Sequence, residues 1–258
     1  MKRILIPTDY SNLSDFAITS GAKFAEKIEA EVVLMHVICN ESENRNQADE
    51  QIEMVRSSKI FGDVPYKVKI SEGNPIAEIV NQQADFIIMG SHIEKGVNGF
   101  FHPTNSERVA KLANCPVITL KHYLDLSNVS HIVYPTDMRT EQKKFIPEIK
   151  FLQELYDAKL HLVKIFYDDN MIKESQIEKR LHVFAKHHDL KNYEVTALPG
   201  MNESKEIFKF AESIDADLIA LLTHERNKFE RWIGGYVSGS ILRQSPVAIY
   251  SKVINSSN

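Results

Sequence analysis

The chain has 258 residues, which suits one large domain or two of ordinary size. Its 43% hydrophobic and 26% charged residues are typical of a globular protein, and its formal charge of −4 gives no bulk attraction to nucleic acid. No apolar run reaches the roughly 20 residues that span a bilayer, and none near the N-terminus suits a signal peptide, so we expect a cytoplasmic protein without membrane or nucleic-acid partners.

The first half of the chain alternates between apolar runs and segments with apolar residues at helical spacing. The runs are nearly continuous, as in parallel strands covered on both faces, and Asn74-Pro75 is typical of a helix start. Strands that alternate with helices predict an α/β fold with a doubly wound, mainly parallel sheet and helices on both faces. The expected strands are 3–8, 31–38, 66–70, 85–89 and 116–120, and the expected helices are about 14–29, 47–58, from 75 onwards, and 104–114.

The second half of the chain repeats the first in the same order. Ile132–Asp137 restates Ile4–Asp9, and Asp217–His224 restates Asp85–His92. Anchors of this kind, in the same order and at offsets of 127 to 132, indicate a tandem duplication. The expected division is a first domain at 1–121, a linker at 122–130 and a second domain at 131–258.

One loop of the first copy lies where ligands are expected. The run Phe86–Met89 ends at Gly90, and the polar segment after it leads to Thr104, which can cap a helix, with Glu107 three residues on. In a parallel sheet this loop lies at the carboxyl ends of the strands, where ligands bind, and a helix start suits an anion. The alternative is a connecting loop that binds nothing.

Two signals together resemble the universal stress protein family. One is the strand end Pro7-Thr8-Asp9-Tyr10-Ser11, and the other is Gly90-Ser91-His92, with a helix start and Cys115-Pro116-Val117 behind it. The resemblance covers almost the whole chain as two fused copies, and it implies two tandem Rossmann-like doubly wound domains, each with a five-stranded sheet. It also implies pairing through the last strand, so we expect the two copies to form a pseudo-dimer within one chain. A homodimer of the chain and further protein partners remain open.

The family divides into members that bind ATP and members that do not. The ATP-binding members carry Gly, two residues, Gly, nine residues, Gly, then Ser or Thr. In the first copy Gly90 stands at the first glycine position and Thr104 at the Ser or Thr position. Ile93 and Pro103 replace the second and third glycines. Because Ile93 is penalised at positive φ and Pro103 has no N–H donor, the phosphate side of such a site is weakened.

The adenosine side of the first copy is better matched to the family. Asp9 stands at the acidic position beside the nucleotide, and Val37 at the strand end beside the adenine. Asp9 has a second interpretation, as a cap for the helix that follows it, and for Asp137 in the second copy the cap is favoured. No cofactor is required, and ATP or another adenine nucleotide in the first domain is the alternative. The site residues implied for the first domain are Pro7, Asp9, Val37, Gly90, His92 and Thr104.

The second copy departs further from the ATP-binding pattern. Leu222 and Glu225 replace the first two glycines, Gly235 matches the third, and Tyr236 replaces the Ser or Thr. A carboxylate about 4 Å from a phosphate would repel it by roughly 4 kcal/mol at an effective dielectric constant near 20. We therefore expect no triphosphate at this position.

Neither a metal site nor a catalytic set stands out in the sequence. His92 and His224 occupy matching positions, but no second ligand follows at metal spacing, and the pair His187-His188 is expected to be solvated. No Ser-His-Asp set or carboxylate pair with catalytic spacing is present, so we do not expect an enzyme. The leading function is therefore a binding or interaction module of the stress response. The second is a nucleotide sensor in the first domain, and the third is a slow ATP hydrolase.

Overall fold

The computed structural model describes residues 1–39, 45–92, 104–167, 173–224 and 234–254. The chain divides into two compact units, Met1–Ser127 and Asn128–Asn258, which we call the first and second domains. In this described part of the chain, no helix combines the length and the apolar character needed to cross a membrane.

The first domain is an α/β domain with five parallel strands. Its elements are β1 (Arg3–Thr8), α1 (Asn12–Ile28), β2 (Glu31–Ile38), α2 (Arg45–Ser57), β3 (Tyr66–Glu72), α3 (Pro75–Val80), β4 (Phe86–Gly90), α4 (Asn105–Leu112) and β5 (Val117–Leu120). The strands lie in the order β3-β2-β1-β4-β5. The order therefore reverses between β1 and β4, so the topological switch point, where ligands of such sheets bind, lies beside the carboxyl end of β1.

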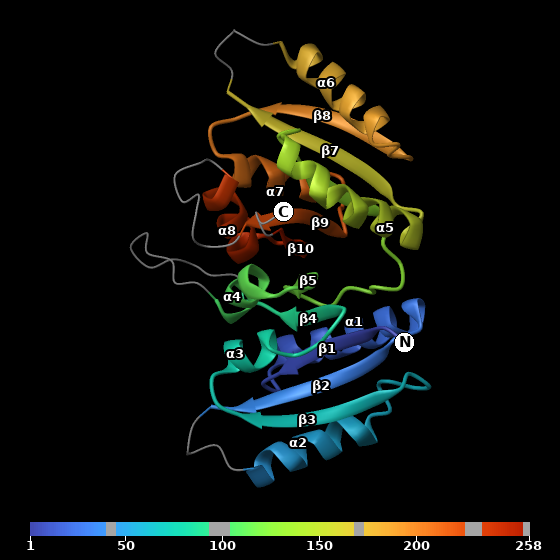
Figure 1. Ribbon diagram of the computed structural model, residues 1–258, viewed down its shortest axis with the longest axis vertical. Helices are drawn as coiled ribbons and strands as arrows, with labels where there is room; N and C mark the ends of the chain where they lie inside the picture. The colour runs from blue at the N-terminus through green and yellow to red at the C-terminus, as the bar shows by residue number, and fades with distance from the viewer. Residues whose placement is uncertain (40–44, 93–103, 168–172, 225–233, 255–258) are drawn as a thin grey trace. The chain divides into compact units, whose positions relative to one another are not determined.

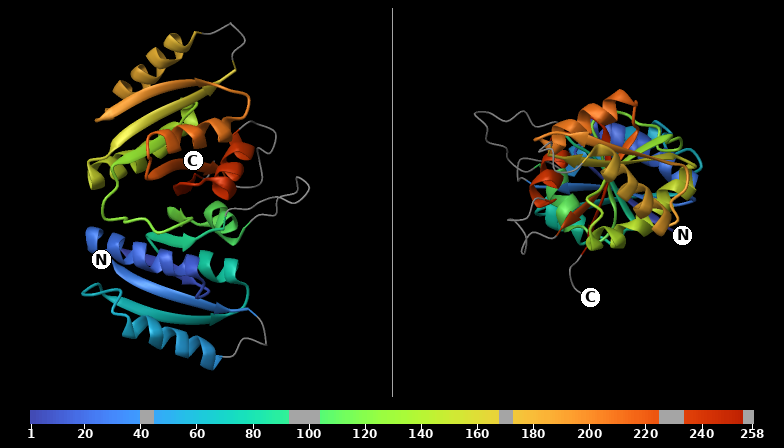
Figure 2. Two further views of the ribbon diagram at one scale, coloured as in Figure 1. Left: turned by 180° about the vertical axis from the view of Figure 1, so that it is seen from behind. Right: turned by 90° about the horizontal axis from the view of Figure 1, so that it is seen from above.

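Helices cover both faces of this sheet (Figure 1). α3 and α4 pack against each other on one face, and α1 lies on the other against β1 and β4, as the view from behind also shows (Figure 2). The central strands are buried on both faces, and Ile4, Ile6 and Ile88 have no accessible surface. β3, in contrast, alternates between half-buried and exposed side chains, in agreement with its alternating sequence.

The second domain repeats this topology, as the duplication predicts. Its elements are β6 (His131–Pro135), the 3₁₀ helix η1 (Thr140–Phe145), α5 (Ile146–Tyr156), β7 (Lys159–Phe166), α6 (Glu174–His187), β8 (Tyr193–Pro199), α7 (Glu203–Ser213), β9 (Leu218–His224), α8 (Gly234–Gln244) and β10 (Ala248–Ile254). Its strands are parallel, in the order β10-β9-β6-β7-β8. The main difference is that η1 and α5 stand where the first domain has the single helix α1.

The amino ends of the strands in the second domain carry a histidine pair, in which His161 is buried and His131 is half-buried. Nδ1 of His131 and Nε2 of His161 are 3.0 Å apart, so one of the two nitrogens carries the shared proton. Nδ1 of His161 lies 3.6 Å from a carboxylate oxygen of Glu194, which also pairs with Lys159, and the His161 ring contacts Phe210 of α7. Burial lowers the pKa of His161 below its usual value, His131 and Lys159 lower it further, and Glu194 opposes them.

We expect the second domain to lose stability as the pH falls from about 7.5 to about 5.5, a range that spans the ordinary histidine pKa. His161 takes up a proton less readily in the folded than in the unfolded chain, so its contribution is complete above the unfolded pKa and is lost below it. His188, whose pKa burial also lowers, acts in the same direction. Urea unfolding at the two pH values should show a smaller difference for His161→Gln than for the wild type, while the exposed His122→Gln should match the wild type. An unchanged difference in His161→Gln would contradict the assignment.

Candidate functional site

The turn after β1 presents Asp9 at the switch point of the first domain. The N–H and the hydroxyl of Ser11 donate to Oδ1 of Asp9 at 3.0 and 2.6 Å, and the N–H of Tyr10 donates to Oγ1 of Thr8 at 3.0 Å. Tyr10 takes a left-handed conformation, with φ of 58°. The N-cap of α1 is Ser11, whose hydroxyl accepts from the N–H of Ser14. The interpretation of Asp9 as the cap itself is therefore wrong, because Asp9 holds the capping residue in place from two positions earlier.

The Asp9 carboxylate is exposed and held in its ionised form. Desolvation by its surroundings would raise the pKa, but the hydrogen bonds from Ser11 outweigh it and hold the pKa of Asp9 below its ordinary value. Among the described residues, no cation lies within ion-pair distance of this carboxylate. An ionised acceptor of this kind suits hydroxyl donors on a ligand.

The residues beside Asp9 come from the ends of β1 and β2. Thr8 pairs with His36, and Nδ1 of His36 lies 2.9 Å from the carbonyl oxygen of Thr8. Val37, one residue further along β2, is 8% exposed. Pro7 is buried opposite Met35. Pro7 and Val37 are each the last residue but one of their strand, so both lie at the carboxyl ends.

Gly90 ends β4 where α1 crosses closely over the sheet. A Cβ atom at this position would lie 2.4 Å from the carbonyl oxygen of Leu13 and 2.6 Å from its carbonyl carbon. Any side chain larger than hydrogen would therefore collide with the backbone of α1. The close packing of α1 therefore explains the glycine at this position without any ligand. In the second domain the matching residue, Leu222, is accommodated as a buried side chain.

A chain of hydroxyl groups connects the ends of β4, α4 and β5. Nζ of Lys121 donates to Oγ of Ser91 at 2.7 Å and to the carbonyl oxygen of His92 at 3.0 Å. Oγ of Ser106 donates to Oγ of Ser91 at 2.6 Å and lies 2.9 Å from Oγ1 of Thr104. Thr104 caps α4 by accepting from the N–H of Glu107 at 3.1 Å, which confirms the predicted helix start.

The structure thus places all six predicted residues at the carboxyl ends of neighbouring strands, just after such an end, or at the start of α4, with the Pro7 side chain buried. Lys121, Ser91 and Ser106 were not predicted as site residues. The sequence carries one signal for Lys121, namely a lysine that directly follows the last strand of the first copy. The motif positions Ile93, Pro103 and Glu225 lie outside the described residues.

The second domain has the same turn after its first strand, but there the aspartate carboxylate is paired with an arginine. The N–H of Met138 donates to Oγ1 of Thr136 at 3.0 Å, and Met138 is left-handed with φ of 62°, as Tyr10 is. The N–H of Arg139 donates to Oδ1 of Asp137 at 3.1 Å, and its guanidinium Nε lies 3.0 Å from Oδ2. Asp137 is therefore ion-paired, whereas Asp9 is held by hydroxyl and amide groups.

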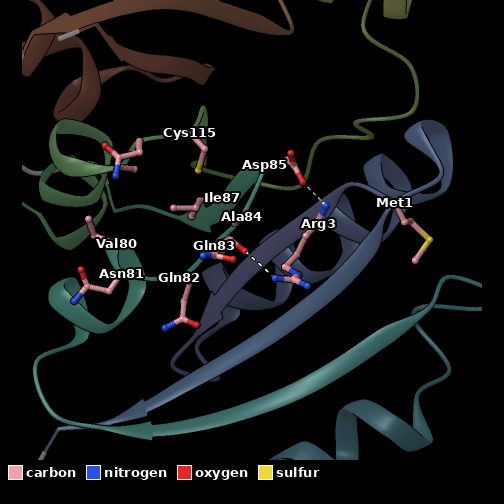
Figure 3. A pocket seen from close by; sticks show the side chains of 12 residues that line it. Met1, Arg3, Val80, Asn81, Gln82, Gln83, Ala84, Asp85, Ile87 and Cys115 are labelled. Atoms are coloured by element: carbon pink, nitrogen blue, oxygen red, sulfur yellow. Dashed lines mark hydrogen bonds between the residues drawn. The ribbon is translucent and has the colours of Figure 1, made fainter. Parts of the chain in front are cut away.

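A pocket of about 600 Å³ lies at the opposite, amino end of the first-domain strands (Figure 3). It is lined by the starts of β1 and β4 and by the ends of α3 and α4. The N–H of Arg3 donates to Asp85 at 2.7 Å, and its guanidinium donates to the carbonyl oxygen of Gln83 at 3.2 Å and to Glu31 at 2.8 Å. The five residues of β4 separate this pocket from Asp9 and Thr104 by roughly 15 Å at the usual rise per residue.

Comparisons with known proteins agree on one family. The Universal stress protein family matches residues 1–121 and 128–250. Universal stress protein MJ0577 of Methanocaldococcus jannaschii is 29% identical over 153 residues, which cover 46% of this chain and 94% of that protein.

Solved structures agree on the two-domain architecture. A universal stress protein from Archaeoglobus fulgidus superposes with a TM-score of 0.76 at 19% identity, covering 98% of this chain and 97% of that one. A functionally unknown protein from Pseudomonas aeruginosa gives a TM-score of 0.72 at 15% identity, covering 98% and 92%. With two matching segments that together span most of its length, the chain belongs to the universal stress protein family, as a tandem two-domain member.

Proposed function

We propose that the chain is a binding module of the stress response in which the first domain alone binds an adenine nucleoside or nucleotide. The observation that carries this proposal is the exposed, ionised Asp9 at the switch point, beside the apolar Val37. The second domain supports it by contrast, because Arg139 already occupies the matching carboxylate of Asp137.

In this proposal the ribose hydroxyls of the ligand donate to Asp9, and the base lies toward the end of β2. Two backbone N–H groups of the first turn of α4, beside Thr104, remain for an anionic group. The sequence of the loop opposes a long phosphate chain, since Ile93 and Pro103 stand at glycine positions. We therefore expect weak binding in which the terminal phosphates add little affinity.

The second domain is proposed to bind no nucleotide triphosphate. Arg139 pairs with the carboxylate that would accept the ribose, and Glu225 puts a negative charge at the second glycine position of the phosphate-binding motif. We still predict that the two domains pair through their terminal strands. A protein partner that binds this module is likewise a prediction.

The proposal is tested by the variant Asp9→Asn in the full chain. The asparagine side chain keeps an oxygen for Ser11 but removes the charge, so adenosine affinity is expected to fall about 10- to 100-fold, the range for a hydrogen bond to a charged group. Titration calorimetry with adenosine measures the change, and Asp137→Asn is the matched control that should leave the affinity unaltered. Equal affinity in Asp9→Asn and the wild type would contradict the proposed site.

A further inference from the structure

The pocket at the amino end of the first-domain sheet is lined by carboxamide side chains (Figure 3). Three of them, on Asn81, Gln83 and Asn114, are exposed and make no side-chain hydrogen bond with the described part of the chain. The carboxamide of Gln82, in contrast, is used within the fold, because its oxygen and its nitrogen are both hydrogen-bonded, at 2.7 and 2.8 Å. Three groups that each donate and accept are therefore left for a ligand.

The second domain shows that the fold does not require these carboxamides. Asp85 and its counterpart Asp217 serve the same purpose in the two domains, since each carboxylate accepts the N–H of the residue that begins the first strand, at 2.7 and 2.9 Å. Counted back from Asp217, a serine and an aspartate stand at the positions of Asn81 and Gln83. The closing of the strand start is thus common to both domains, whereas two of the three carboxamides belong to the first domain alone.

The charges around the pocket disfavour an ionic ligand. The guanidinium of Arg3 is paired with Glu31 at 2.8 Å and donates to the carbonyl oxygen of Gln83 at 3.2 Å. An anion would meet the carboxylate of Asp85 and the carbonyl ends of α3 and α4, which carry partial negative charge. A cation would meet the guanidinium of Arg3. The lining therefore suits a neutral ligand whose groups both donate and accept hydrogen bonds.

We propose that this pocket binds a neutral sugar of one or two rings. Sugar hydroxyls match carboxamides because each of these groups donates and accepts. The buried Ile87 and Ala113 and the half-buried Val80 give the pocket an apolar part, which suits the C–H face of a sugar ring. The volume of about 600 Å³ lies within the range of pockets that hold small molecules. The length of β4 separates this site from the one proposed for an adenine nucleotide.

Cys115 allows occupancy of the pocket to be measured. It lines the pocket, and neither Cys115 nor Cys39 is in a disulfide. Cys39 follows the carboxyl end of β2, at the opposite end of the sheet, and is the control within the same chain. D-Glucose or maltose at roughly 100 mM should slow alkylation of Cys115 by iodoacetamide more than about tenfold, as a dissociation constant near 1 mM implies, and leave Cys39 unchanged. Peptide mass spectrometry of the full chain measures both rates.

The triple variant Asn81→Ala, Gln83→Ala, Asn114→Ala tests the carboxamides directly. It breaks no side-chain hydrogen bond of the described chain, and the carbonyl oxygen at 83 still accepts from Arg3. The glucose concentration that gives half-protection of Cys115 should rise at least about fivefold, the effect of losing two neutral hydrogen bonds. Gln51→Ala is the matched control, because it removes an exposed carboxamide from α2.

Two charged analogues of glucose test the neutral character of the ligand. Glucosamine and glucuronate should both protect Cys115 less than glucose does, and stronger protection by either would overturn the proposal. Protection that the triple variant retains in full, or that Cys39 shows equally, would also overturn it.

Saturation-transfer NMR of the glucose protons gives a second measurement that does not depend on the thiol. Transfer that the triple variant lowers would support the site even if Cys115 stays reactive. Transfer that the triple variant leaves unchanged, or the absence of both transfer and protection, would overturn the proposal.

Discussion

Gly90→Ala is expected to destabilise the first domain by about 2–3 kcal/mol, at the upper end of the range for overpacking a tight site. The new Cβ would meet the carbonyl group of Leu13 at 2.4 Å. That group belongs to the backbone of α1, so the helix or the end of β4 has to move. Thermal unfolding of the full chain should show the first-domain transition about 5–10 °C lower.

Gly21→Ala is the comparison that isolates the backbone collision. Its Cβ would also approach an atom at 2.4 Å, but that atom is Cδ1 of Ile6, the end of a flexible side chain. Alanine also gains roughly 1 kcal/mol of helix propensity over glycine inside a helix. The net change at Gly21 should therefore stay below about 1 kcal/mol. If Gly90→Ala is as stable as the wild type, the collision with the backbone of α1 does not explain the glycine.

The fold was predictable because its signals are local and occur twice. Apolar runs marked the strands in both copies, and the repeated strand end at Asp9 and Asp137 fixed the register of the duplication. The left-handed residue after each of these aspartates was not predicted, since Tyr10 and Met138 are not residues that favour positive φ. Their conformation depends on the hydrogen bonds to Thr8 and Thr136 within each turn.

The candidate site was predictable only along the family motif. Thr104 follows from local capping rules, and the position of Asp9 from the strand end before it. Lys121 was missed because its contact with Ser91 joins residues 30 positions apart, and no local pattern marks such a pair. The packing role of Gly90 was missed for the same reason, because it depends on how closely α1 crosses β4.

The largest gain of function is expected from the double variant Ile93→Gly, Pro103→Gly in the first domain. The two changes restore positive-φ freedom at one motif position and an N–H donor at another. One or two charge-assisted hydrogen bonds to phosphate would raise ATP affinity by about 1–3 kcal/mol, or roughly 5- to 150-fold, while adenosine affinity stays constant.

Ile93→Ala, Pro103→Ala is the matched control for this variant. It removes the β-branched side chain and restores the N–H at 103, but alanine remains disfavoured at positive φ. A gain in the glycine variant that exceeds the gain in the alanine variant assigns the defect to the backbone angle, and equal gains assign it to the missing donor. If both variants fold as the wild type does and neither gains ATP affinity, the loop is not what limits triphosphate binding.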